Sequence, residues 1–223
     1  MFPITIVDNF LTEPFKFAKY VKGLQFNKNE KGNYPGTRTN PLDQENNGLF
    51  MDVATKTLAL FYENIPQAWG VDMRIQKIMP FAATKEEQYS CKNQGWIHTD
   101  SDNALVGILY LDEDPLPNTG TDFYKEKEGY AYGIKGAIDL KEAFYLEKKI
   151  NKEEYEKAFH SLNDQYEKTI SIENVFNRLI LFRGNQLHGA RTFGYGDKPR
   201  YILNMFWENN YGKSGPLQRC RVI

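Results

Sequence analysis

Cysteine and histidine are both scarce in this chain of 223 residues, which has two of the first and three of the second. Two cysteines are too few for a disulfide-stapled scaffold, and Cys91 and Cys220 lie far apart and outside any CxxC pattern. We therefore interpret both as thiols without a structural or metal-binding role. Any histidine ligand must come from His98, His160 or His188.

The sequence also lacks an excess of charge of either sign, since its formal net charge is -1. No global basic field would draw it onto nucleic acid, so we do not expect a nucleic-acid partner. Its start lacks a basic segment followed by an apolar one, and no later apolar run is long enough to span a membrane. We expect a cytoplasmic protein without a membrane contact.

No repeat, low-complexity tract or Pro/Gly/Ser-rich linker divides the sequence. The length suits one domain, and we assign residues 1–223 to it. Aromatic residues make up 14% of the chain, which favours packed sheets with aromatic-lined interiors over disorder or a coiled coil.

Residues 1–70 are expected to form a helical support. Ile4 and Ile6 indicate a short strand, and residues 33–38 indicate a turn or loop. One helix is predicted after Thr12, and a second helix is predicted to begin at an Asp52 cap. The apolar residues expected to share a helix face are Phe15, Ala18 and Val21 in the first and Ala54, Leu58 and Phe61 in the second.

From residue 71 the pattern changes to strands, predicted within residues 73–78, 105–111, 121–124, 179–182 and 201–207. Residues 125–174 interrupt them as a charge-rich insert. Two patterns in the insert resemble helix capping boxes, Asp139 with Glu142 and Asn151 with Glu154. We predict a helical insert, which would serve either as a substrate lid or as a contact in a homodimer.

The residues that carry chemistry lie among these strands. In an extended segment residues i and i+2 point to the same side, so His98 and Asp100 can offer an imidazole and a carboxylate to one metal. His188 can complete a facial triad, whose three open positions suit iron(II) that binds an organic chelate and dioxygen together. Taken alone, such a triplet is more often a solvated turn, and a lone histidine is more often structural.

The order of motifs around these histidines is more specific than any of them alone. After the apolar strand come His-X-Asp, "ILYLDED", "GTDF", "NRLILF", a histidine and "RYILNMFW". In this order, residues 71–208 resemble the 2-oxoglutarate- and iron(II)-dependent oxygenases, most closely their prolyl-hydroxylase-like branch. The resemblance implies a mainly β fold with flanking helices, around a double-stranded β-helix (a jelly-roll, cupin-like core). It also implies Fe(II) held by His98, Asp100 and His188.

The same resemblance implies a binding residue for 2-oxoglutarate. The basic residue of the family's last core strand falls on Arg200, with Lys198 beside it as the alternative. The distal carboxylate of the co-substrate would be desolvated in the barrel, and a guanidinium can meet it with two parallel hydrogen bonds. A family hydroxyl that binds this carboxylate matches Tyr110. Tyr89 and Asn204 are further candidates, the first on a core strand and the second on the face of Arg200 by strand alternation.

Other residues have weaker assignments. Arg191 is a candidate substrate contact, and Arg38 could reach the mouth of the site. Trp96 and Trp207 are interpreted as core or pocket wall, and His160 as a solvent-facing helix residue.

Such an enzyme consumes O2 and 2-oxoglutarate, forms succinate and carbon dioxide, and hydroxylates a C–H bond; ascorbate keeps the iron of many relatives reduced. The resemblance favours a peptidyl or amino-acid side chain such as proline, although similar barrels act on small molecules. A cupin-like protein that binds metal or ligand without turnover and a zinc hydrolase with the same three ligands remain open. Against the hydrolase, no glutamate base lies in a motif beside the ligands.

Overall fold

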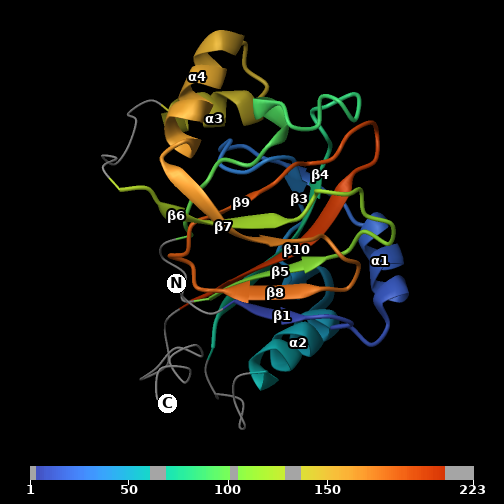
Figure 1. Cartoon of the computed structure of the whole chain (residues 1–223). Coiled ribbons are helices and arrows are strands. Elements are labelled where there is room, and N and C mark those ends of the chain that lie inside the picture. Colours follow the sequence, from blue (N-terminus) through green and yellow to red (C-terminus); the bar gives the residue numbers. More distant parts are fainter. Residues whose placement is uncertain (1–3, 61–68, 101–104, 129–136, 209–223) are drawn as a thin grey trace.

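A computed structural model describes residues 4–60, 69–100, 105–128 and 137–208 of the chain, and structural statements below refer to these residues (Figure 1). Its strands are β1 (Thr5–Val7), β2 (Asn27–Lys28), β3 (Thr37–Arg38), β4 (Val71–Ile78), β5 (Leu105–Tyr110), β6 (Thr121–Glu126), β7 (Tyr166–Ile172), β8 (Leu179–Phe182), β9 (His188–Ala190) and β10 (Arg200–Trp207). Its helices are α1 (Pro14–Lys22), α2 (Leu42–Ala59), α3 (Ala137–Tyr145) and α4 (Lys152–Asn163), with a 3-10 turn at Cys91–Asn93. The protein is mainly β with flanking helices, as predicted.

The larger sheet has seven strands in the order β1-β8-β5-β10-β4-β3-β2. Its centre is β10, which pairs antiparallel with β5 on one side and β4 on the other. The first 70 residues form more than a helical support, because β1 adds to one edge of this sheet and β3 with β2 to the other. Residues 37–38, expected in a turn or loop, instead form strand β3, in which Arg38 lies opposite Gln76 of β4.

The smaller sheet has three strands in the order β7-β6-β9. Strand β7 corrects the expectation for the insert, whose last part is a core strand and not a helix. Gly120, just before β6, lies very close to the backbone at the end of β7: a Cβ there would lie 1.9 Å from the carbonyl oxygen of Ile172. Only glycine permits such an approach of two backbones.

The two sheets pack face to face over one apolar cluster, to which β5, β8 and β10 contribute from one side and β6 and β7 from the other. On the outer face of the larger sheet a second cluster packs under α1 and α2. Strand β5 serves both clusters: Val106 and Ile108 point between the sheets, while Leu105 and Leu109 point toward the helices. Both of its faces are buried, which accounts for its continuous apolar run.

Two expectations about the N-terminal helices are wrong. In α1 the buried apolar residues are Phe17, Ala18 and Val21, whereas Phe15 is 64% exposed and contacts Phe176. Helix α2 begins at Leu42, ten residues before the expected Asp52 cap, because its first amides bond to the carbonyl of Pro41 and Leu42 is buried. It is kinked at Asn46, whose backbone is not helical and whose side chain accepts from the Leu49 amide.

The buried face of α2 includes Ala54 and Leu58, as predicted, and Phe61 lies outside the described residues.

The helices of the insert pack over the segment that precedes β5, with Tyr155 and Phe159 of α4 against Trp96. The Asn151 side chain caps α4 as predicted, accepting from the amides of Glu153 and Glu154. Asp139 is not a cap, because it lies inside the first turn of α3.

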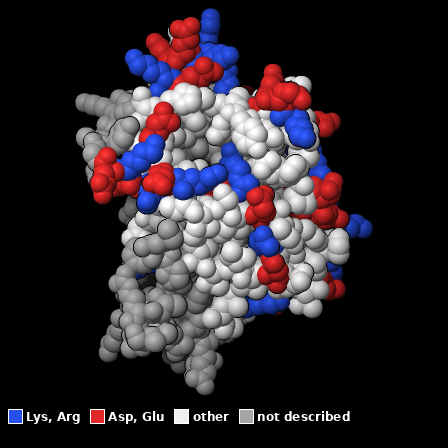
Figure 2. Space-filling model, viewed as in Figure 1, with Lys and Arg blue, Asp and Glu red and all other residues white. Residues whose placement is uncertain are grey.

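Figure 2 shows acidic and basic side chains intermixed at the end of the molecule formed by these helices. In the described part of the chain, no helix is both long enough and apolar enough to cross a membrane.

Candidate metal and co-substrate site

Three potential metal ligands meet at the mouth of the space between the sheets. His98 and Asp100 lie in the segment before β5, and His188 begins β9. The backbones of His98 and His188 pair as an antiparallel bridge, and the amide of Asp100 donates to the Gly184 carbonyl. Nε2 of His188 lies 3.4 Å from Asp100 Oδ2, and Nε2 of His98 lies 3.9 Å from Asp100 Oδ1. The structure therefore brings the three residues together, with the i, i+2 geometry expected of His98 and Asp100.

Backbone carbonyls orient both imidazoles. Nδ1 of His98 lies 2.9 Å from the carbonyl oxygen of Trp96, and Nδ1 of His188 lies 2.9 Å from that of Gln186. An Nδ1–H that donates to a carbonyl leaves the lone pair on Nε2, which in both rings is the atom near Asp100. Desolvation by burial lowers the pKa of both histidines, and the neighbouring His188 lowers that of His98 further. Both rings are thus neutral at neutral pH, as metal ligands must be.

The His98 ring keeps 42% of its surface accessible, although burial of the rest of the ring lowers its pKa. Both statements hold because the ring lies inside a hollow: solvent reaches one side of it while protein surrounds the rest.

The donor set fits a metal ion. One ligand atom from each of the three residues lies within 4.8 Å of the other two. Two imidazoles and one carboxylate form the set typical of non-haem iron(II), although zinc accepts the same atoms.

Arg200 is the buried cation of the same space. It is 4% exposed, and within the described chain its Nε has no hydrogen-bond partner. The guanidinium carbon lies 5.7 Å from the centroid of the Tyr110 ring, and burial lowers the pKa of Arg200. A buried cation without a bound anion is costly, so this geometry fits an anionic ligand.

The lining of one cavity of about 450 Å³ includes the three potential ligands and Arg200. Strand alternation aims Arg200, Ile202 and Asn204 into the cavity, so Asn204 lies on the face of Arg200 as predicted. The Asn204 amide nitrogen donates to Gln76 Oε1 over 2.6 Å.

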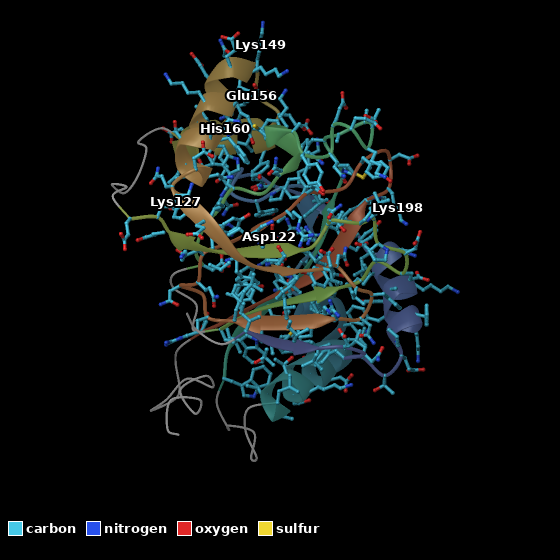
Figure 3. The ribbon with its side chains drawn as sticks, in the orientation of Figure 1. Asp122, Lys127, Lys149, Glu156, His160 and Lys198 are labelled. Carbon is cyan, nitrogen blue, oxygen red and sulfur yellow. The ribbon has the colours of Figure 1, made fainter. Side chains whose placement is uncertain are left out.

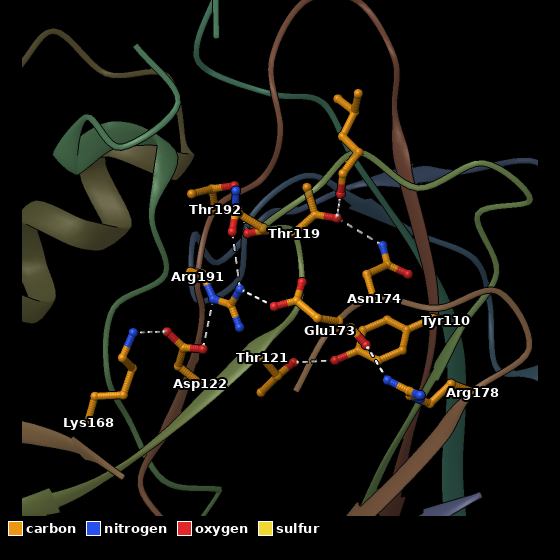
Figure 4. Close-up of polar contacts among 12 residues, drawn as sticks. Tyr110, Thr119, Thr121, Asp122, Lys168, Glu173, Asn174, Arg178, Arg191 and Thr192 are labelled. Carbon is orange, nitrogen blue, oxygen red and sulfur yellow. Dashed lines mark hydrogen bonds and ion pairs between the residues drawn. The ribbon is translucent and has the colours of Figure 1, made fainter. Parts of the chain in front are cut away.

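Tyr110 is fully buried behind the wall of this cavity. Its hydroxyl donates to Oγ1 of Thr121 over 2.8 Å, and Thr121 itself lines the cavity (Figure 4).

Several candidates lie elsewhere. Tyr89 is not on a core strand: it lies in a turn and is 51% exposed. Lys198 is exposed and its ammonium pairs with Asp114 at 2.7 Å, on the outside of the molecule (Figure 3). Arg191 is bound by Asp122 and Glu173, so its charge belongs to a structural network and not to the pocket (Figure 4).

The remaining assignments agree with the structure. Trp96 is both core and pocket wall, and Trp207 is core. His160 lies on the outside of α4, with Nε2 3.3 Å from the sulfur of Cys91 (Figure 3). Cys91 is partly buried, and Cys220 lies outside the described residues.

Arg38, which the sequence suggested could reach the mouth of the site, lines the cavity. Gln76 and Lys141 line it too, and neither was expected there. Gln76 carried one usable signal: strand alternation places it on the face of β4 opposite to the apolar residues Met73 and Ile75. Lys141 carried none, because nothing in the insert distinguishes it from the lysines around it.

Comparison with known proteins now identifies the family. A family model described as "Family of unknown function (DUF6445)" matches residues 2–193. The chain belongs to the DUF6445 family. No curated protein matches this DUF6445 member in sequence.

Solved structures are similar to it at low identity. HygX from Streptomyces hygroscopicus, with nickel and 2-oxoglutarate bound, is 12% identical with a TM-score of 0.58, over 94% of this chain and 84% of that one. The α-ketoglutarate-dependent epimerase SnoN from nogalamycin biosynthesis is 12% identical with a TM-score of 0.53, over 92% and 77%. A Trichoplax adhaerens prolyl hydroxylase in complex with a hypoxia-inducible-factor peptide is 12% identical with a TM-score of 0.51, over 92% and 83%.

These likenesses establish the fold. This DUF6445 protein has the double-stranded β-helix of the 2-oxoglutarate- and iron-dependent oxygenases, the class that its motif order resembles.

Proposed function

We propose that this protein is an Fe(II)- and 2-oxoglutarate-dependent dioxygenase that hydroxylates a C–H bond of a peptidyl or amino-acid side chain such as proline. One observation carries the proposal: a His-Asp-His ligand set and a buried arginine without a hydrogen-bond partner at Nε line the same cavity. The first fits the metal, and the second fits the far carboxylate of the co-substrate. A pocket for metal alone has no use for the arginine.

In the proposed enzyme His98, Asp100 and His188 hold iron(II). The carbonyls of Trp96 and Gln186 fix the ring orientation of the two histidines, so little rearrangement accompanies metal binding. Bound iron with 2-oxoglutarate and O2 supplies the oxidising power for C–H hydroxylation, with succinate and carbon dioxide as co-products.

Arg200 binds the distal carboxylate of 2-oxoglutarate, and Thr121 is the hydroxyl on the cavity side that can assist it. Tyr110 then acts through Thr121, since its own hydroxyl donates to Thr121 Oγ1. The apolar side chains of Val106, Ile108 and Ile202 line the cavity and keep water away from this pair of charges. In such surroundings an arginine–carboxylate pair is stronger than at the surface.

The test is anaerobic reconstitution with iron(II), followed by addition of 2-oxoglutarate. We expect one iron per chain, a weak visible charge-transfer band on adding 2-oxoglutarate, and slow succinate release after oxygen is admitted. Iron binding without the band would contradict the proposal and favour a metal-binding protein without turnover. Zinc-dependent hydrolysis with no response to 2-oxoglutarate would favour the hydrolase.

A further inference from the structure

The mouth of the cavity carries positive charge that the proposed reaction does not use. Arg38 of β3 and Lys141 of α3 both line it, one from the N-terminal part of the chain and the other from the insert. Neither belongs to the ligand set, and neither stands at the place of Arg200.

Arg38 is held in position by its neighbours. Its guanidinium lies over the Tyr34 ring, 3.8 Å from the centroid, and its Nε and Nη2 donate to Gln76 Oε1 over 3.3 and 3.1 Å. Gln76 in turn donates to the carbonyl of Pro35, which fixes the segment that carries Arg38. The Nε and Nη2 edge of the Arg38 guanidinium is thereby occupied. Within the described residues, Nη1 has no hydrogen bond. Burial lowers the pKa of Arg38 to about 10, so the group stays charged at neutral pH.

Lys141 lines the same cavity as the three potential ligands. Helix α3, which carries it, packs against the segment before Arg38: a Cβ on Gly32 would lie 2.5 Å from the carbonyl oxygen of Glu142. Lys141 is partly buried, and burial lowers its pKa. Among the residues that the structure describes, its ammonium makes no hydrogen bond or ion pair. A partly desolvated ammonium in this state is suited to an incoming anion.

These two cations are separate from Arg200. Arg38 lies opposite Gln76 of β4, whereas Arg200 lies opposite Ile78, and β3 and β10 flank β4 on its two sides. Two strand spacings place their backbones roughly 10 Å apart. The guanidinium of Arg200 lies 5.7 Å from the Tyr110 ring centroid, and the charges that act on its pKa are those of Tyr110 and Asp112. The cavity therefore has two positively charged regions, Arg200 and the pair Arg38 and Lys141, and 2-oxoglutarate would occupy only the first.

Two carboxylates also line this cavity. Both oxygens of Asp72 accept from Nε of Arg74, at 2.9 and 3.0 Å, so its charge is largely compensated. Glu208 follows the last residue of β10 and lies beside Gly70 at the outer end. Together with Asp100 they disfavour a doubly charged anion, whereas a single carboxylate suits the remaining hydrogen-bonding capacity of Arg38 and Lys141.

We propose that the substrate presents a carboxylate, which Arg38 and Lys141 bind at the mouth of the cavity while the C–H bond to be oxidised faces the metal ligands. This inference rests on the oxygenase function proposed above and adds to it the chemical class of the substrate. Arg38 and Lys141 are substrate-binding residues in this reading, and Gln76 is a positioning residue for Arg38.

Trifluoroacetate is a suitable probe, because its ¹⁹F signal broadens near a paramagnetic ion. The protein is loaded with cobalt(II) in place of iron and saturated with 2-oxoglutarate, which occupies Arg200. We expect trifluoroacetate to bind and to broaden, and neutral trifluoroethanol to show no binding. Loss of one charged partner should weaken trifluoroacetate about tenfold or more in Lys141→Met and in Arg38→Gln. Lys152→Met, an exposed lysine of the same insert that pairs with Glu156, should bind like the wild type.

Unchanged trifluoroacetate binding in Lys141→Met overturns the proposal, because the anion would then lie on the metal or elsewhere. This variant decides even if Arg38→Gln unfolds, since Lys141 has no hydrogen bond among the described residues to lose. Inorganic phosphate that binds more tightly than trifluoroacetate overturns the choice of a carboxylate. Displacement of the probe by free amino acids supports a small-molecule substrate, and displacement only by peptides with a free carboxyl group supports a peptide.

The two proposals fail in different ways. If the 2-oxoglutarate band is absent but trifluoroacetate binds and depends on Lys141, the oxygenase function is wrong and the anion site stands. If the band forms and the probe does not bind, the oxygenase function stands and the anionic substrate is wrong.

Discussion

Gly95 lies so close to Ala190 that a methyl group on its α-carbon would come within 2.5 Å of the Ala190 amide nitrogen. The Gly95 amide donates to the Ala190 carbonyl over 2.8 Å, and three residues further on His98 pairs with His188. This contact therefore sets how closely the segment that carries two potential ligands approaches the strand that carries the third.

Gly95→Ala should push these two segments apart. We expect a loss of roughly 1–3 kcal/mol in the free energy of unfolding from the overpacking, together with weaker iron binding. Thermal unfolding and an iron titration of the same preparation measure both. Gly48→Ala is the matched control, because a Cβ there meets only the Asn46 side-chain oxygen at 3.4 Å, inside helix α2. It should keep or slightly raise stability and leave iron binding unchanged, and equal behaviour of the two variants would contradict this account.

The ligand assignment predicts that His98→Ala and His188→Ala each abolish iron binding, because two remaining protein ligands hold the ion poorly. His160→Ala should bind one iron per chain like the wild type, since its ring lies on the outside of α4 near Cys91. Metal analysis after anaerobic reconstitution and desalting provides the measurement. Loss of iron in the His160 variant would show that the site has been placed wrongly.

Arg200→Ala should weaken 2-oxoglutarate by a hundredfold or more in dissociation constant, since breaking a desolvated ion pair costs roughly 3–5 kcal/mol. Iron affinity should hardly change, and Arg200→Lys should be intermediate because it keeps the charge but loses the fork. Lys198→Ala is the control, because its ammonium is bound to Asp114 on the surface. A titration of the iron-loaded variants with 2-oxoglutarate decides, and a weakened Lys198 variant beside a normal Arg200 variant would reverse the assignment.

The ion pair between Asp8 and Arg178 predicts a pH-dependent contribution to stability. Arg178 Nε lies 2.6 Å from Asp8 Oδ1, and this hydrogen bond lowers the pKa of Asp8 below its usual value. The contribution is therefore present above the unfolded-state pKa of about 3.9 and is lost as the pH falls through the lower folded-state pKa. Asp8 is about half exposed, so we expect less than about 1 kcal/mol.

Thermal unfolding of Asp8→Asn against the wild type checks this. The difference should be constant from pH 7 to pH 5 and should shrink at more acidic pH. A difference that grows toward low pH would have the wrong sign for this pair.

The main apolar strands and the common orientation of His98 and Asp100 could be predicted from the sequence because their signals are local, whereas His188 was added by the resemblance to a family. Alternation on β10 already placed Asn204 on the face of Arg200, and an extended His98–Asp100 segment needed only its own spacing. Strand β7 could not be predicted, because it is an amphipathic, half-exposed strand that forms only where β6 is available to pair with it. The start of α2 was missed for a similar reason, since the burial of Leu42 comes from tertiary packing.

The residues at the mouth of the cavity could not be grouped from the sequence. Arg38 and Lys141 are more than 100 positions apart and belong to segments without a common motif, so only the folded chain reveals that they line one space. Lys198 could be separated from Arg200 only by its ion pair with Asp114.

The pairing of His98 with His188 leads us to expect that the ligand cluster forms late in folding. Ninety residues separate the two histidines, and proteins dominated by such distant pairings fold slowly, because the chain must close long loops before any contact rewards it. No partly folded state that lacks β9 can bind metal with all three side chains. Binding of iron or cobalt(II) during refolding should therefore report when β9 joins the segment of His98 and Asp100. Added metal should slow unfolding more than it speeds folding.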